Sequence, residues 1–262
     1  MVDSGFITLP IIFGALCGAV AWGYFTWYFG LPSSSTHALI GGMIGVSLFA
    51  NHGNLEILHW SGIGKVLLFM IISPVCGLLA GMTLMTILGW LVRPFAHFDS
   101  NRLLKRIQVG SAMFMSYSHG MNDAQNAMGI ITIALLSAGV MTEFQVPLWV
   151  RIASAIAMGL GTSVGGWRII KTMGQKISRL EPIDGCAAET SAGTVITISS
   201  LFGAPISTTH VISTAIVGAV GARGLRQVNW YVVRSIITAW LLTFPGAAVC
   251  GIICYLLTVL FL

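Results

Sequence analysis

Charged side chains are scarce in this chain of 262 residues, where Asp, Glu, Lys and Arg make up 8%, against roughly 25% in an average soluble domain. A chain with so little charge and so much apolar sequence is neither a soluble globular protein nor a disordered one. The alternation of apolar and polar residues that a membrane barrel requires is also missing, because segments such as Val66–Val92 are apolar on every face. These absences leave a helical membrane protein.

Cysteine is also sparse, and acidic residues are fewer than basic ones. The five cysteines all lie inside apolar segments and lack the spacing of metal ligands or of a disulfide framework. The 13 Lys and Arg residues, against 8 Asp and Glu, gather in short clusters. We interpret these clusters as determinants of membrane topology and expect no nucleic-acid partner.

Long apolar runs are what the sequence has in abundance. Hydrophobic residues make up 56% of the chain, and the mean hydropathy is +0.88. Runs of 18 or more apolar residues are long enough to cross a bilayer. We therefore predict an all-α polytopic membrane protein whose apolar segments are 6–29, 30–50, 65–92, 111–139, 147–166, 185–202, 205–222 and 235–262.

Two basic segments predict the topology. Arg93–Gln108 carries four basic residues and one acid, and Trp167–Asp184 carries four basic residues. The positive-inside rule places both segments in the cytoplasm. Residues 185–222 have basic residues beyond both ends, so we expect them to form a re-entrant hairpin that enters from the cytoplasm and returns to it.

An internal repeat relates the two halves of the chain. The stretches Gly30–His37 (GLPSSSTH) and Gly203–His210 (GAPISTTH) align without gaps and share Gly, Pro, Ser, Thr and His. The basic segments predict opposite orientations for the two copies, and inverted repeats with broken helices are typical of secondary transporters. We predict a first repeat over 1–92 (hairpin 6–50, span 65–92), a cytoplasmic loop over 93–108 and a second repeat over 109–262.

The first repeat is expected to be incomplete. The polar stretch His119–Asn126 of the second repeat would have its counterpart before Met1. If that counterpart supplies half of the cation ligands, the chain of 262 residues inserts into the membrane without transporting. A non-transporting fragment is therefore one of the alternatives that the sequence leaves open.

The polar stretch of the second repeat contains a candidate cation site. Asp123 is a carboxylate within an apolar segment, where it costs on the order of 3 kcal/mol unless it is compensated. Asn122 and Asn126 share a helical face with each other, and Gly120 and Gly129 are expected to let the helix open and expose carbonyls. These oxygens suit a hard monovalent cation. The alternative is a hydrogen-bond network that only holds helices together.

Glu189 is the other acidic residue inside an apolar segment. It lies in the arm before the second Pro-x-Ser element, and its counterpart in the first repeat is Leu16, so the repeat symmetry fails there. The sequence does not decide between a ligand for Na⁺ or a proton and an acid that packs between helices.

The two Pro-x-Ser elements predict helix starts that bind an anion. Proline suits the first turn, and the hydroxyls of Ser34, Ser207 and the neighbouring threonines cap the new helices. Helix N-termini bind anions, and because these elements contain no Lys or Arg, co-bound cations would neutralise a divalent oxyanion. The alternative is ordinary capping, with His37 and His210 bonded to carbonyls at the hairpin tips.

Four stretches resemble the PiT family of inorganic phosphate transporters, in its smaller bacterial form. They are Gly30–Gly42, His119–Asn126, Gly165–Gly174 and Gly203–His210. The resemblance implies a homodimer of inverted-repeat protomers in the plasma (inner) membrane that carries inorganic phosphate with Na⁺ or H⁺. It maps the phosphate ligands onto Ser34, Ser35, Thr36, Asn126, Ser207, Thr208 and Thr209, and the coupling-ion ligands onto Asn122, Asp123 and Asn126, to which we add Glu189.

We therefore expect an ion-coupled phosphate symporter that is not an enzyme and needs no cofactor beyond the coupling ion. The sequence does not distinguish Na⁺ from H⁺, or phosphate from a metal–phosphate complex. A permease for sulfate or another tetrahedral oxyanion is the nearest alternative. An intramembrane hydrolase using Ser207 and His210 is disfavoured, because Ser and His recur in both halves while a catalytic pair needs one site.

Overall fold

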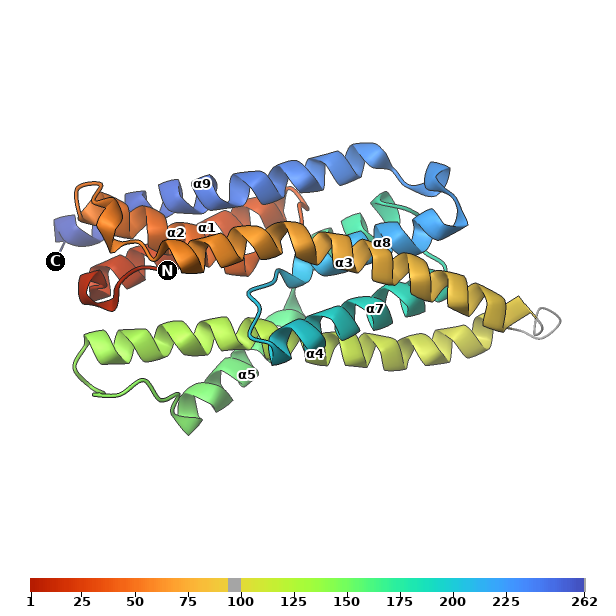
Figure 1. Ribbon diagram of the computed structural model, residues 1–262, viewed down its shortest axis with the longest axis horizontal. Coiled ribbons are helices and arrows are strands. Elements are labelled where there is room, and N and C mark those ends of the chain that lie inside the picture. Colours follow the sequence, from red (N-terminus) through yellow and green to blue (C-terminus); the bar gives the residue numbers. More distant parts are fainter. Residues whose placement is uncertain (94–99, 262) are drawn as a thin grey trace. The chain divides into compact units, whose positions relative to one another are not determined.

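The computed structural model describes residues 1–93 and 100–261 of the chain, and there it is helical with no β-strand (Figure 1). Within these residues three helices are long and apolar enough to cross a membrane, and the bent pair Leu148–Val164 and Trp167–Lys176 is a fourth candidate. The prediction of an all-α polytopic membrane protein is confirmed. The α-helices are α1 (Leu9–Tyr28), α2 (Ser35–Ala50), α3 (Trp60–Val92), α4 (Ser100–Ser137), α5 (Leu148–Val164), α6 (Trp167–Lys171), α7 (Pro182–Leu201), α8 (Thr208–Arg223) and α9 (Trp230–Phe261).

The chain forms two compact units, each built from separate stretches of sequence. Unit 1 contains Met1–Lys65, Asp123–Gly166 and Ile236–Leu262, and unit 2 contains Val66–Asn122 and Trp167–Ser235. Helix α4 contributes its first part to unit 2 and its second part to unit 1. Each unit therefore combines one helical hairpin with a stretch of α4 and a long apolar helix.

In unit 1 the hairpin of α1 and α2 lies beside the C-terminal helix α9 (Figure 1). Small residues form the contacts with α9. A Cβ atom on Gly18 would clash with the backbone of Gly251, and a Cβ atom on Gly45 would clash with Ala248. Glycines at a helix interface let the two backbones approach closely, which is how membrane helices gain packing energy without a hydrophobic driving force.

The glycine contact between α1 and α9 predicts a large effect of one substitution. Gly18→Leu should lower the apparent melting temperature in detergent sharply, because the new side chain forces α1 away from Gly251. Gly23→Leu, on the same helix, is the control, since no atom lies within 4 Å of the Cβ position there. Equal melting temperatures of the two variants, measured by fluorescence-detected size exclusion, would contradict this packing.

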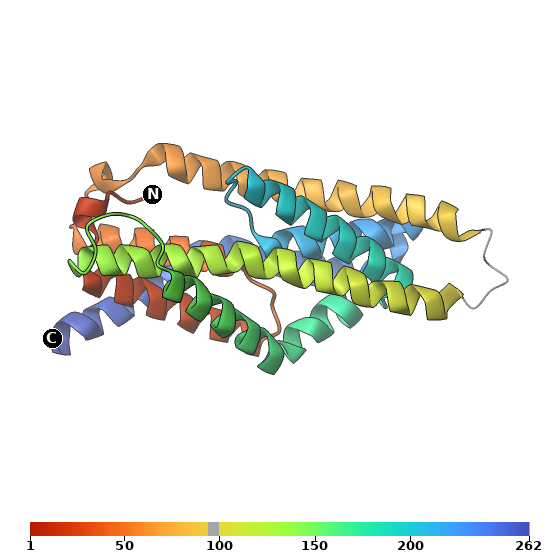
Figure 2. The same cartoon turned by 90° about the horizontal axis from the view of Figure 1, so that it is seen from below.

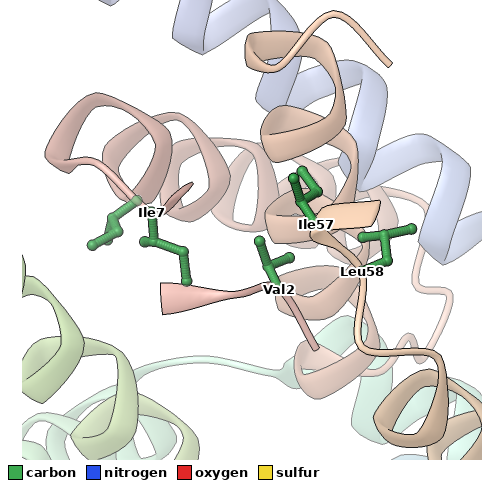
Figure 3. Close-up of a cluster of buried hydrophobic side chains, with 5 residues drawn as sticks. Val2, Ile7, Ile57 and Leu58 are labelled. Carbon is green, nitrogen blue, oxygen red and sulfur yellow. The ribbon is translucent and has the colours of Figure 1, made fainter. Parts of the chain in front are cut away.

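A cluster of buried aliphatic side chains closes the open end of the same hairpin (Figure 3). Val2 and Ile7 from the N-terminal segment meet Ile57 and Leu58 from the loop after α2, and Val2 bridges to Leu58 through the backbone. Side chains of α2 and of the second part of α4 pack around this cluster. Apolar burial therefore ties the base of the first hairpin to α4.

In unit 2 the hairpin of α7 and α8 packs against α3, again through glycine. A Cβ atom on Gly77 would lie 2.6 Å from the Val211 carbonyl oxygen, and one on Gly218 would clash with Leu78. The base of this hairpin differs from that of the first, because Arg223 on α8 is 2.8 Å from carboxylate oxygens of both Glu181 and Asp184 at the start of α7. The base of the second hairpin is therefore stabilised by ion pairs, whereas the base of the first is stabilised by apolar burial.

Both hairpins reverse through the same local geometry, which supports the sequence repeat. Gly30 has a φ of 67° and Gly203 a φ of 62°, the left-handed region that favours glycine. Ser34 (φ −90°, ψ 117°) and Ser207 (φ −97°, ψ 115°) then cap the second arms. The shared glycine and serine in the two motifs are therefore explained by one broken-helix conformation used twice.

Each hairpin packs against the long helix that belongs to the other predicted repeat. The first hairpin packs on α9, which belongs to the predicted second repeat, and the second hairpin packs on α3, which belongs to the first. Each partner helix contains an internal proline, Pro74 in α3 and Pro245 in α9. The compact units are therefore different from the predicted repeats, whose boundaries stay a prediction.

The predicted opening of the helix around Asp123 is wrong, and both basic segments contain helix. Helix α4 is continuous from Ser100 to Ser137 (Figures 1 and 2), so Gly120 and Gly129 do not open it, because an isolated glycine costs only about 1 kcal/mol inside a helix. Residues 100–108 of the predicted loop are helical, and residues 94–99 lie outside the described residues. The segment Trp167–Asp184 contains α6, a π-helical turn over Thr172–Lys176 and the start of α7.

Candidate functional site

The tip of the first hairpin presents a capped helix N-terminus. The Ser34 hydroxyl accepts a hydrogen bond from the His37 amide at 3.2 Å, and the hydroxyls of Thr26 and Ser33 are hydrogen-bonded at 2.7 Å across the break. The indole N–H of Trp240 on α9 donates to the Pro32 carbonyl at 3.1 Å. These bonds leave the next two hydroxyls, on Ser35 and Thr36, directed at groups outside the hairpin.

Helix α4 meets those two hydroxyls with Asp123 and Asn126. Ser35 Oγ donates to a carboxylate oxygen of Asp123 at 3.1 Å, and the Asn126 amide donates to Thr36 Oγ1 at 2.9 Å. The two α4 residues are one helical turn apart, so they lie side by side on one face. Within unit 1 the structure therefore brings together a carboxylate, an amide and two hydroxyls at a helix N-terminus.

This set of atoms suits an ion pair of cation and oxyanion. The carboxylate and amide oxygens are hard ligands for an alkali cation, and the helix N-terminus with its hydroxyls favours an anion. No group of three or more His, Cys, Asp and Glu suitable for a metal ion occurs over residues 1–93 and 100–261. The chemistry of the site is therefore that of oxygen ligands rather than of thiolate or imidazole.

The second hairpin repeats the capping geometry in unit 2. The Ser207 hydroxyl accepts from the His210 amide at 3.2 Å, and Thr208 begins α8 with its side chain buried. Asn122, the last residue that α4 contributes to this unit, accepts a hydrogen bond from Ser200 at 3.2 Å, just before the hairpin breaks. Asn122, which is predicted to be a cation ligand, thus contacts the first arm of the second hairpin, α7.

Glu189 lies further along the contact between α4 and α7. Its carboxylate accepts a hydrogen bond from Ser111 at 2.5 Å, and Ser118 pairs with Thr197 at 2.9 Å between Glu189 and Asn122 along the helices. These pairs make the α4–α7 contact polar over several turns. Glu189 therefore has a hydrogen-bond partner within unit 2, whereas Leu16, its counterpart in the first hairpin, is an exposed apolar residue.

The two histidines of the repeated motif are packed into the protein. The exposed fraction of His37 is 0% and that of His210 is 1%. The His37 ring stacks on Phe244 of α9, with the ring centroids 4.9 Å apart. This environment favours the structural interpretation of His37 over a direct role in binding.

The structure places the candidate residues in two groups. Unit 1 holds five of them and unit 2 holds the other five. Sequence reasoning missed Ser111, Ser200 and Trp240, since serine and tryptophan are common in apolar segments and only the structure shows their partners. The group in unit 1 is Ser34, Ser35, Thr36, Asp123 and Asn126, and the group in unit 2 is Asn122, Glu189, Ser207, Thr208 and Thr209.

Two hydroxyl-capped broken helices, together with carboxylates and amides inside apolar segments, define a polytopic membrane transport protein. Comparison with known proteins supports this class. Residues 2–251 match the model of the phosphate transporter family. The chain belongs to this family.

Curated relatives cover most of the chain. It is 42% identical over 256 residues to a probable low-affinity inorganic phosphate transporter of Rhizobium meliloti, covering 97% of this chain and 76% of the relative. The identity to a protein of the same description from Bacillus subtilis is 39%, covering 94% and 73%. A solved structure described as the sodium-dependent phosphate transporter shares the fold, with a TM-score of 0.84 at 24% identity over 100% of this chain and 83% of that one.

Proposed function

We propose that this protein carries inorganic phosphate across the plasma membrane as a symporter coupled to Na⁺. The single observation that supports it most is the contact of Ser35 and Thr36, at the start of α2, with Asp123 and Asn126 of α4. Because no Lys or Arg lies in the two Pro-x-Ser elements, a phosphate dianion needs a cation as counter-charge. A bound Na⁺ at the Asp123 carboxylate supplies that charge, which couples the two ions.

Each candidate residue has a role in this proposal. Asn122, Asp123 and Asn126 bind the coupling ion. Glu189, which accepts a hydrogen bond from Ser111, offers Na⁺ or a proton a separate carboxylate further along the contact between α4 and α7. The hydroxyls and amides at the start of α2 bind phosphate, and those at the start of α8 bind it as well. Asn126 is a ligand for both phosphate and the coupling ion. The phosphate ligands are Ser34, Ser35, Thr36, Asn126, Ser207, Thr208 and Thr209.

The names of the relatives support phosphate as the substrate, and the sodium-dependent transporter of the same fold supports Na⁺ over H⁺. We also propose a homodimer, on the family resemblance alone. A sulfate permease remains the second candidate, because hydroxyls and helix N-termini bind any tetrahedral oxyanion.

Uptake of labelled phosphate into proteoliposomes tests the proposal. An inward Na⁺ gradient should drive accumulation above equilibrium, and an equal K⁺ gradient should not. Arsenate should compete at concentrations similar to phosphate, because it shares the shape and protonation of phosphate, whereas sulfate should compete poorly. Accumulation driven by a pH gradient without Na⁺ would identify H⁺ as the coupling ion, and stronger competition by sulfate than by arsenate would favour the sulfate permease.

A further inference from the structure

The first hairpin is held at its tip by aromatic residues of α9 that have no assigned role in transport. Trp240 is nearly buried, with an exposed fraction of 8%, and its indole N–H donates to the Pro32 carbonyl at 3.1 Å. Phe244, one helical turn further along α9, stacks on His37, and a Cβ atom on Gly41 would lie 2.6 Å from the Phe244 carbonyl oxygen. One face of α9 thus contacts the hairpin break and the first two turns of α2.

The hydrogen bond from Trp240 lies next to the binding atoms. Pro32 precedes the cap residue Ser34 by two positions, and Ser35 and Thr36 follow directly. Because Pro32 is within the break, its backbone position depends on this bond rather than on a helical hydrogen-bond ladder. A shift of the Pro32 carbonyl would therefore move the two hydroxyls relative to Asp123 and Asn126.

The residue of α3 that corresponds to Trp240 cannot make the same contact with the second hairpin. When α3 and α9 are aligned on their internal prolines, Pro74 and Pro245, the residue that corresponds to Trp240 is Phe69, which has no N–H group to donate. The contacts of α3 with α8 are instead made at Gly77, Gly81 and Gly218. At this position the repeat symmetry therefore does not extend to the indole contact.

We infer that Trp240 is a positioning residue for the ion site: its indole N–H fixes the tip of the first hairpin so that Ser35 and Thr36 meet Asp123 and Asn126. The inference rests on the proposed function for its effect on phosphate. Trp240 is not one of the proposed ion ligands. It acts through the backbone of Pro32, and the buried carbonyl left without its donor costs more than the bond itself contributed.

Two substitutions remove the indole N–H at position 240. Trp240→Phe deletes the donor together with part of the ring, and benzothienylalanine introduced at 240 by nonsense suppression keeps the bicyclic volume and deletes only the N–H. The control is Trp230→Phe on the same helix, whose indole N–H donates to the Leu225 carbonyl at 3.2 Å at an exposed position. All three proteins are made as the full chain and purified in detergent.

The first readout is amide hydrogen exchange, which needs no ligand. Both variants at position 240 should exchange about 5-fold faster or more over residues 30–38, with residues 203–211 unchanged, and Trp230→Phe should leave both segments at the wild-type rate. Unchanged exchange over 30–38 in the benzothienylalanine protein overturns the inference, even if Trp240→Phe fails to fold.

The second readout is phosphate affinity in Na⁺. Loss of the N–H should weaken phosphate binding about 5- to 10-fold with little change in maximal uptake or in membrane abundance. Ser35→Ala, alone and combined with the change at 240, should show effects that are less than additive, because both act on the same hydroxyl. Full additivity, or an unchanged affinity despite faster exchange, overturns the positioning role. If the wild-type protein binds no phosphate, the proposed function fails, and hydrogen exchange alone decides whether Trp240 orders the tip.

Discussion

Asp123→Asn should abolish Na⁺-driven phosphate uptake while the protein still inserts into the membrane. The asparagine keeps the size of the side chain and can still accept from Ser35, but it removes the negative charge that holds the cation. Without a bound cation the Pro-x-Ser elements offer phosphate no positive counter-charge, because they contain no Lys or Arg. We expect uptake to fall at least about 100-fold, the equivalent of roughly 3 kcal/mol.

The control for Asp123→Asn is Glu143→Gln, an exposed acid in the connection between α4 and α5. It removes one negative charge from the same unit without touching the site. Uptake, membrane abundance and the Na⁺ concentration for half-maximal phosphate binding are measured for both. Wild-type uptake in Asp123→Asn would remove Asp123 from the transport mechanism and leave its bond to Ser35 as a helix-packing contact.

The broken helices could be predicted from sequence because their chemistry is local. Glycine at a left-handed φ, followed by proline and a capping serine, gives a helix break and restart wherever it occurs. The motif occurs twice, so Gly30 and Gly203 indicated two hairpins without knowledge of their surroundings. The low charge of the chain likewise indicated the membrane, because burial in lipid constrains composition over whole segments.

The sequence could not predict which long helix each hairpin packs against. Glycines such as Gly18 and Gly81 indicate close helix contacts, but an apolar segment carries no mark of which other segment it meets. For the same reason the sequence does not distinguish Trp240 from the other apolar residues of the last span. The expected opening of α4 at Gly120 and Gly129 was wrong because a glycine permits a break without requiring one.

The sequence predicted which residues belong to the candidate site. It did not predict which of them contact one another. Asp123 stood out since carboxylates are costly in apolar segments, and the hydroxyls stood out through the repeat. That Ser35 pairs with Asp123 and Thr36 with Asn126 depends on the register between α2 and α4. Register is set by side-chain packing along both helices, which a single sequence does not display.

Arg223→Ala should destabilise the protein more than any other single change at the base of the second hairpin. Arg223 neutralises Asp184, whose exposed fraction is 0%, and also pairs with Glu181, which is largely exposed. Removal of the arginine leaves a buried carboxylate without a counter-charge, which typically costs about 3–5 kcal/mol. The arms α7 and α8 would lose their link at the end away from the Ser207 tip.

A double variant distinguishes the effect of the unpaired buried charge from the effect of losing the arginine side chain. Asp184→Asn combined with Arg223→Ala removes both charges and keeps the amide oxygen that can accept from the Glu181 amide, as Asp184 does at 2.8 Å. The double variant should therefore recover much of the melting temperature lost by Arg223→Ala, because no uncompensated charge remains buried. Arg226→Ala, just beyond the end of α8, serves as the control for loss of a basic residue. If the double variant melts as low as Arg223→Ala, the packing of the arginine stem rather than its charge holds the hairpin base together.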